Sequence, residues 1–110
     1  MKSSREIYTL TGITRKTLRG YVSLGLLVPE GKNARGGWIF SDEAVVLVHR
    51  IRNFQSMGFT LREMSDVLSM SDGQLREALQ EKIKELQMQE DQVREKILCA
   101  QNALRKLEES

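Results

Sequence analysis

The sequence is poor in cysteine, proline and aromatic residues, and it contains no long hydrophobic run. Its single cysteine, Cys99, excludes an internal disulfide and any metal site made from several cysteines of this chain. No apolar stretch approaches the roughly 20 residues that a bilayer-spanning helix needs. The N-terminal residues also lack the apolar segment of a secretory signal. We therefore expect a cytoplasmic protein with a reduced cysteine and no membrane partner.

Groupings of residues that perform catalysis are also missing. The sequence shows no nucleophile paired with a base, no metal-ligand cluster and no phosphate-binding loop, since the glycines of residues 31–37 lack P-loop spacing. The 110 residues are 40% hydrophobic but only 5% aromatic, which allows one compact domain with a thin core, plus an extension. We expect a protein that is not an enzyme and that uses no cofactor and no metal.

Charge is distributed unevenly, although the formal net charge is only +2. Residues 1–60 contain nine Lys and Arg against four Asp and Glu, whereas residues 61–110 contain eight against eleven. This asymmetry favours a polyanionic partner for the first part and a different task for the second. A chance fluctuation in composition explains the charge distribution equally well, so other features have to decide.

Two short helices joined by a tight turn are predicted near the N-terminus. Ser3 and Glu6 have the spacing of a capping box, which begins the first helix. Gly12 ends it, because glycine accepts the left-handed backbone conformation common at that place. Thr14 can cap the second helix, which we expect over about residues 15–24. A helix, a short turn and a second helix form a helix-turn-helix pattern.

The second of these helices has the pattern of a DNA recognition helix. Arg15, Lys16 and Arg19 fall within five positions, and Leu18 is left for the opposite, packed face. A helix that enters the DNA major groove needs one packed face, one cationic face and a fixed angle of entry. The sequence therefore predicts that this helix contacts DNA.

The segment that follows is expected to fold back and form a hairpin. The Leu-Leu-Val run at 26–28 should pack beneath the second helix, and Pro29 prevents helical continuation. Three glycines and an asparagine within residues 30–40 separate short apolar ends, which is typical of a hairpin, or wing. Lys32 and Arg35 are expected near its tip. A plain surface loop is the alternative.

Two further helices are predicted before residue 70. Ser41 can cap the first of them, and one face of that helix is apolar at spacings of four and three residues: Leu47, Ile51 and Phe54. Thr60 and Glu63 form a second capping box, which begins the next helix. The apolar residues of that helix are Leu61, Met64, Val67 and Leu68.

Residues 71–110 read as one long amphipathic helix, separate from a domain over residues 1–70. Counted in 3-4 alternation, eight of nine positions are apolar, and Glu90 is the exception: Leu79, Ile83, Leu86, Val93, Ile97, Ala100, Leu104 and Leu107. A helix of about 36 residues is roughly 54 Å long, too long for a domain of this size to cover the stripe. A second copy is the simplest cover, so we predict a homodimeric coiled coil with these eight residues at its interface.

Several motifs occur in one collinear order over residues 7–68. They are Thr17-Leu18-Arg19 with Tyr21, Gly25-Leu26-Leu27-x-Pro29, Gly37-Trp38-x-Phe40-Ser41, Ile51-Arg52 and Met57-Gly58-Phe59-Thr60-Leu61-x-Glu63-Met64. This set resembles the DNA-binding domain of the MerR family of transcription regulators. The resemblance implies a mainly α fold: a winged helix-turn-helix with a small β-hairpin wing, followed by a long C-terminal helix that forms an antiparallel coiled-coil dimer.

The resemblance also implies a function and the residues that carry it. Family members bind a promoter palindrome as homodimers and distort the DNA, so the implied partners are double-stranded DNA, a second copy of the chain and RNA polymerase. The residues carried over as DNA contacts are Thr14, Arg15, Lys16, Thr17, Arg19, Tyr21, Lys32 and Arg35. Thr14 serves equally well as a helix cap. Arg50 and Arg52 are weaker candidates, because charges of the third helix are often only solvated.

Three positions depart from the family pattern, and one of them is Val22, which stands where the family has glutamate. Gly20 stands where the family has an aromatic residue, and glycine inside a helix is about 1 kcal/mol less favourable than alanine. Ile39 stands where the family's wing has arginine, which removes an expected phosphate contact. Two other functions stay open: an architectural, excisionase-like protein that bends DNA, and a protein-interaction module whose coiled coil is the functional surface.

Overall fold

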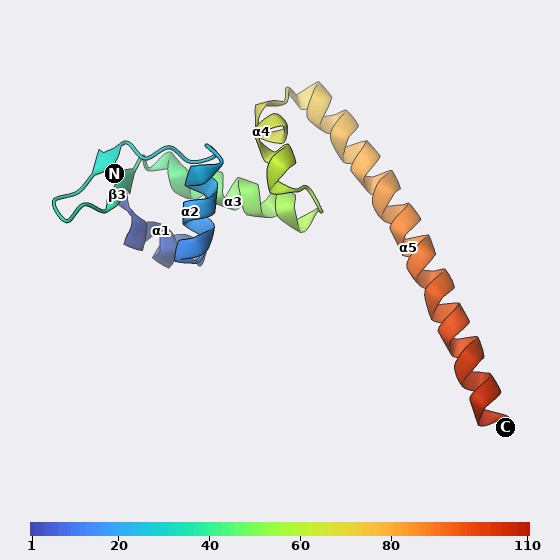
Figure 1. The fold of residues 1–110 in the computed structure, drawn as a ribbon. Coiled ribbons are helices and arrows are strands. Elements are labelled where there is room, and N and C mark those ends of the chain that lie inside the picture. The colour runs from blue at the N-terminus through green and yellow to red at the C-terminus, as the bar shows by residue number, and fades with distance from the viewer. The chain divides into compact units, whose positions relative to one another are not determined.

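The computed structural model describes residues 1–110, which form five helices and one small antiparallel sheet (Figure 1). The helices are α1 (Ser4–Thr11), α2 (Arg15–Ser23), α3 (Glu43–Ser56), α4 (Leu61–Ser69) and α5 (Asp72–Glu108), and the strands are β1 (Lys2–Ser3), β2 (Gly31–Lys32) and β3 (Trp38–Phe40). This architecture confirms the predicted mainly α fold with a small wing. Internal contacts divide the chain into two compact units, Met1–Ser69 and Met70–Ser110.

The predicted helix-turn-helix is confirmed, and side chains cap the start of both helices. Ser3 Oγ accepts a hydrogen bond from Glu6 N, and the Glu6 carboxylate accepts one from Ser3 N, both at 3.2 Å. Thr14 Oγ1 accepts a hydrogen bond from Thr17 N at 3.1 Å. Gly12 ends α1 with φ of +75°, a conformation in which other residues are strained. The caps and this glycine together fix where α2 begins.

The sheet has the strand order β1-β3-β2, and both pairings are antiparallel. Strands β2 and β3 form the predicted wing, in which Lys32 pairs with Trp38. Strand β1 was not predicted; its Lys2 pairs with Phe40. A strand of two residues whose partner lies far along the chain leaves no periodicity for sequence analysis to detect. This third strand fixes the wing to the start of α1.

The core of the Met1–Ser69 unit is one apolar cluster to which its four helices and the wing contribute. Its largest fully buried side chains are Tyr21, Phe40, Ile7, Leu18, Ile51, Met64 and Val48. The rings of Phe54 and Phe59 meet edge to face, with centroids 5.8 Å apart. This cluster holds the packed face of α2, so that its other face is left at the surface.

The run after α2 packs inward for two of its three residues. Leu26 and Leu27 are buried, and their N–H groups both donate to the Tyr21 carbonyl, at 2.9 and 3.3 Å. Val28 is 74% exposed, so its predicted burial is wrong. The backbone is held against α2 only as far as Leu27, and Val28 lies one residue beyond the last of these bonds.

The start of α3 also differs from the prediction. The cap residue is Asp42 instead of Ser41, and it makes no side-chain cap hydrogen bond. Its carboxylate accepts a hydrogen bond from the Met1 amino group at 2.8 Å instead, because the pairing of β1 with β3 brings the N-terminus to this place. The buried face of α3 is Ala44, Val48, Ile51 and Phe54, whereas the predicted Leu47 is only half-buried.

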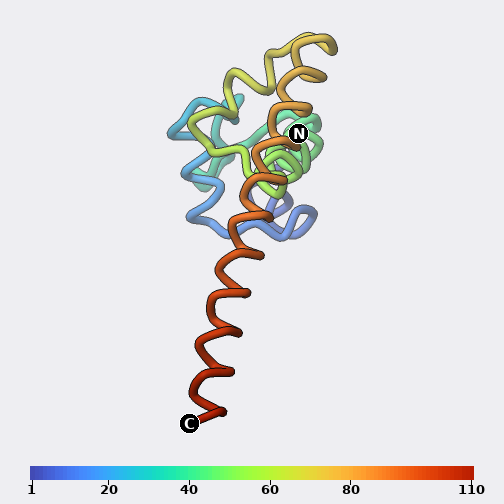
Figure 2. Tube along the Cα trace, turned by 90° about the vertical axis from the view of Figure 1, so that its right-hand side faces the viewer, coloured from blue at the N-terminus to red at the C-terminus, as the bar shows by residue number.

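Helices α4 and α5 both begin with a capping box. Thr60 and Glu63 form the predicted one, with hydrogen bonds of 3.0 and 3.3 Å. Ser71 and Gln74 form another at the start of α5, which sequence analysis overlooked. Helix α5 is continuous over 37 residues (Figure 2) and has no buried residue. No helix of the chain combines the length and apolarity needed to cross a membrane.

Candidate nucleic-acid interface

Helix α2 presents a cationic face because its opposite face is fixed in the core. Leu18 and Tyr21, three positions apart, are 0% and 1% exposed. Arg15, Lys16 and Arg19 occupy the remaining face, and all three are exposed. The structure thus places these three predicted residues on one accessible surface of the helix, ready to meet a ligand.

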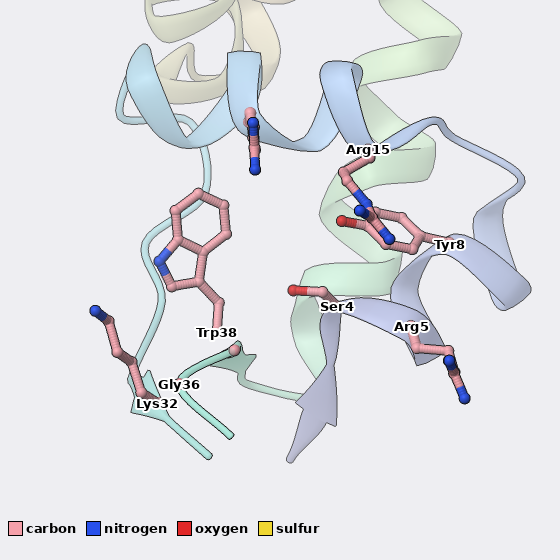
Figure 3. Close-up of a pocket in the computed structure, with 9 residues that line it drawn as sticks. Ser4, Arg5, Tyr8, Arg15, Lys32, Gly36 and Trp38 are labelled. Carbon is pink, nitrogen blue, oxygen red and sulfur yellow. The ribbon is translucent and has the colours of Figure 1, made fainter. Parts of the chain in front are cut away.

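One side of this face borders a hollow between α1, α2 and the wing. This hollow, which we call the wing hollow, has a volume of about 390 Å³ and is lined by Ser4, Arg5, Tyr8, Arg15, Arg19, Lys32, Gly36, Gly37 and Trp38. Figure 3 shows Tyr8 and Arg15 on the helical side of the hollow and Lys32 and Trp38 on the wing side. Four of its nine residues are cations and none is an acid.

The other side of α2 borders a second hollow beside the turn of the helix-turn-helix. This turn hollow has a volume of about 440 Å³ and is lined by Gly12, Ile13, Thr14, Lys16, Thr17, Gly20, Tyr21, Arg52, Gln55 and Leu61. It too contains no acidic residue. Its two cations come from different elements, Lys16 from α2 and Arg52 from α3.

The cations of both hollows have no carboxylate partner. Ion pairs join Met1 to Asp42, Lys2 to Glu6, Lys82 to Glu85 and Arg94 to Glu90. None of these pairs involves a residue of either hollow. Unpaired cations gathered on one surface produce a positive potential that attracts a polyanion. The surface around α2 therefore carries uncompensated positive charge.

The two predicted wing residues occupy different places. Lys32 ends β2 and lines the wing hollow, whereas Arg35 is exposed in the turn of the wing and lines neither hollow. Asn33 holds this turn: its Oδ1 accepts hydrogen bonds from the N–H groups of Arg35 and Gly37, at 3.0 and 2.9 Å. Gly36 has φ of +80°, which favours glycine there. The wing tip is thus a defined turn that projects Arg35 outward.

Tyr21 differs from the other predicted contact residues because it is a core residue. Its ring is buried, and its hydroxyl donates to Gln55 Oε1 at 3.0 Å. Burial raises the pKa of Tyr21 above its ordinary value of 10.0, an effect that the nearby Arg52 guanidinium partly opposes. The side chain joins α2 to α3, and contact with DNA through its ring would require the core to open. It nevertheless lines the turn hollow.

The structure gives Arg52 a specific contact that the sequence did not predict. Its Nη1 donates a hydrogen bond of 2.7 Å to the carbonyl of Thr11, the last residue of α1. Carbonyl groups at a helix end have no partner within the helix, and Arg52 supplies one. The residues lie 41 positions apart, so no local pattern could have predicted the contact. Arg50 is exposed and borders a separate hollow with Leu47 and Ser65.

A helix-turn-helix whose second helix exposes unpaired cations beside a cationic wing defines the class of winged helix-turn-helix DNA-binding domains. The family model for MerR HTH family regulatory proteins matches residues 2–71. The chain belongs to this family of transcription regulators, and residues 2–71 are its DNA-binding domain.

Similarity to known proteins supports this assignment. The mercuric resistance operon regulatory protein of Bacillus cereus is 31% identical over 67 residues, which are 61% of this chain and 51% of that protein. The chain thus spans about half the length of this relative. The N-terminal part of MtaN, the Bacillus subtilis multidrug transporter activator, has the same fold, with a TM-score of 0.84 at 23% identity over 94% of this chain and 98% of that one. HiNmlR, a MerR family regulator bound to promoter DNA, has a TM-score of 0.59 at 18% identity over 93% of this chain and 86% of that one.

Proposed function

We propose that this protein is a cytoplasmic homodimeric transcription regulator that binds an inverted repeat within a promoter and distorts that DNA for RNA polymerase. The observation that carries the proposal is the surface around α2, where the cations of two acid-free hollows have no carboxylate partner. Phosphate contacts supply most of the affinity of such a surface for DNA. The solved complex of HiNmlR with promoter DNA supports the choice of ligand.

The proposed dimer is supported by the unpartnered apolar stripe of α5. Six of its eight predicted interface residues are exposed large hydrophobics, at 43–74%: Ile83, Leu86, Val93, Ile97, Leu104 and Leu107. In a homodimer, a second α5 covers this stripe by coiled-coil packing, and the family resemblance makes the pair antiparallel. Glu90, the polar exception, pairs with Arg94 at 2.6 Å within its own helix. This pairing keeps its charge compatible with a position beside the interface.

DNA distortion requires energy, and the proposed dimer has the means to supply it. Bending a binding site costs several kcal/mol, which phosphate contacts at both half-sites can offset. The two recognition helices must be held at a fixed separation for that purpose. A coiled coil of about 55 Å, from 37 residues at 1.5 Å each, is a suitable rigid spacer.

A salt titration of DNA binding tests the proposal. The full chain is measured against a palindromic promoter duplex and a mixed-sequence duplex, at low and at physiological salt. We expect binding with a steep salt dependence and a clear preference for the palindrome. Arg19→Ala should weaken DNA binding without changing the dimer. Arg50→Ala removes an exposed arginine outside both hollows, and it should leave DNA binding unchanged.

Three outcomes would overturn parts of the proposal. Absence of DNA binding at low salt would favour the protein-interaction module. Binding and bending without preference for any palindrome would favour the architectural, excisionase-like protein. Unchanged affinity of the Arg19→Ala variant would exclude α2 as the recognition helix.

A further inference from the structure

The two hollows lie on different sides of the exposed face of α2. Arg15 and Arg19, one helical turn apart, line the wing hollow, whereas Lys16 and Gly20, also one turn apart, line the turn hollow. Adjacent residues of an α-helix point about 100° apart. The wing hollow and the turn hollow therefore flank the recognition helix, and neither shares a residue with the other.

This arrangement matters because of the size of the DNA major groove. An α-helix with its side chains is about 10–12 Å across, and the groove is about 12 Å wide. A helix in the groove thus fills it, and its two flanks lie against the phosphates of the two opposite strands. Each flank of α2 then meets one wall of the groove.

The wing hollow and the turn hollow have the same construction. On the wing side, Arg15 and Arg19 of α2 are joined by Lys32 of the wing. On the turn side, Lys16 of α2 is joined by Arg52 of α3. In both hollows, a neighbouring element adds a cation to those of the recognition helix. We propose that the turn hollow is a second backbone-phosphate site, in which Arg52 and Lys16 bind the DNA strand opposite to the one that meets the wing.

Arg52 is prepared for this role by its contact with the turn. One N–H of its guanidinium donates to the Thr11 carbonyl at 2.7 Å, and this bond fixes the side chain at the edge of the hollow. A guanidinium has five N–H donors, so four remain available for phosphate oxygens. The start of α2 adds positive potential at the same place through the helix dipole and its unbonded N–H groups.

The remaining lining favours a close approach by a phosphate. Thr14 and Thr17 both line the hollow, and Thr14 Oγ1 donates to Thr17 Oγ1 at 2.9 Å. Gly20 contributes no side chain, and a Cβ built there meets no atom within 4 Å. The glycine that departs from the family pattern thus leaves the hollow open where a side chain would narrow it.

This inference rests on the proposed DNA binding, and salt dependence separates the two. The logarithm of the binding constant falls with the logarithm of salt concentration, with a slope of about −0.9 for each phosphate contact. The probe is a mixed-sequence duplex, whose non-specific binding depends on phosphate contacts alone. We expect Arg52→Gln to reduce the steepness of the slope by about 0.9, as Lys16→Gln does. Arg50→Gln, a matched loss of charge on the same helix, leaves the slope unchanged.

A second variant separates phosphate binding from support of the turn. Arg52→Lys keeps the charge but replaces the forked guanidinium, and we expect it to retain the wild-type slope. If Arg52 only supported the turn, Arg52→Gln and Arg52→Lys would both lower affinity with the slope unchanged, and the inference would be wrong. If the unsubstituted protein does not bind DNA at all, the proposed function itself is wrong. Thermal unfolding of each variant shows which of them remain folded.

Discussion

Among single residues, Gly20 combines a structural disadvantage with a functional use. It lies in the middle of α2, where glycine is less favourable than alanine, and its backbone is not in the left-handed region. No neighbouring atom prevents a larger residue. The packing of the domain therefore does not require glycine at this position. The missing side chain instead leaves the turn hollow accessible.

Replacing Gly20 with alanine should separate stability from DNA binding. We expect Gly20→Ala to raise the free energy of unfolding by about 1 kcal/mol and to lower DNA affinity, because the methyl group enters the turn hollow. Chemical denaturation and duplex titration measure the two effects. Ser23→Ala is the control, since Ser23 ends the same helix and lines neither hollow. Equal or higher DNA affinity of Gly20→Ala would show that DNA does not approach this position closely.

Tyr21 makes the stability of the domain depend on pH in the alkaline range. Its pKa is raised by burial, so the folded state holds the phenol proton more tightly than the unfolded state does. The resulting stabilisation is fully present below the unfolded pKa, near 10, and is lost as pH rises through the higher folded pKa. Tyr21→Phe should remove this component of the stability change above pH 10.

The same substitution also removes the hydrogen bond to Gln55, worth about 0.5–1.5 kcal/mol at neutral pH. Ultraviolet titration of phenolate formation should show a late component in the unsubstituted protein that Tyr21→Phe lacks. If the titration curve kept its late component, another group would be responsible. Tyr8→Phe, at the wing hollow, is the matched control.

At the scale of elements, the wing depends on one polar side chain. Asn33 accepts two backbone hydrogen bonds across the turn between β2 and β3. We expect Asn33→Ala to loosen the turn and to speed amide hydrogen exchange at Arg35 and Gly37. Asn33→Asp retains the acceptor oxygens and should retain protection of both amides. Equal exchange rates in the Ala variant and the unsubstituted protein would show that the backbone alone holds the wing.

The elements whose signals are local were predictable from the sequence. The capping boxes at Ser3 and Thr60 span four residues, and the stripe of α5 repeats every three or four, so neither depends on the rest of the fold. The cationic face of α2 was predictable in the same way, because residues one to four positions apart define it. Short-range geometry was therefore sufficient to predict the helices and the exposed cations of α2.

The contacts that sequence analysis missed connect distant parts of the chain. Arg52 with Thr11 and Met1 with Asp42 are each separated by 41 positions, and Tyr21 with Gln55 by 34. Strand β1 belongs to the same group, since it pairs with β3. Such pairs form only after the chain has packed, and no periodicity announces them. For this reason the turn hollow, which needs α2 and α3 together, was not predictable.

At the scale of the whole molecule, the two units divide the charge and the apolar surface between them. The Met1–Ser69 unit has a closed apolar core and carries the unpaired cations of both hollows. The Met70–Ser110 unit has no buried residue and carries an exposed apolar stripe. A folded chain rarely leaves such a stripe in water unless a partner covers it. The proposed dimer gives this second unit its purpose.

A charge placed on the stripe of α5 should therefore separate the two copies. Ile97 and Leu98 are adjacent and similarly exposed in the single chain, at 50% and 56%, but only Ile97 belongs to the heptad stripe. Ile97→Lys would bury an unpaired ammonium group in each half of the interface, which costs several kcal/mol, whereas Leu98→Lys places it outside the stripe. We expect monomers for Ile97→Lys and dimers for Leu98→Lys by sedimentation.

Ile97→Lys should also lose its preference for a palindromic duplex, because a monomer engages only one half-site. Should both variants sediment as dimers, the assigned stripe is wrong; should both be monomeric, the interface includes Leu98 as well as Ile97 and is wider than the assigned stripe.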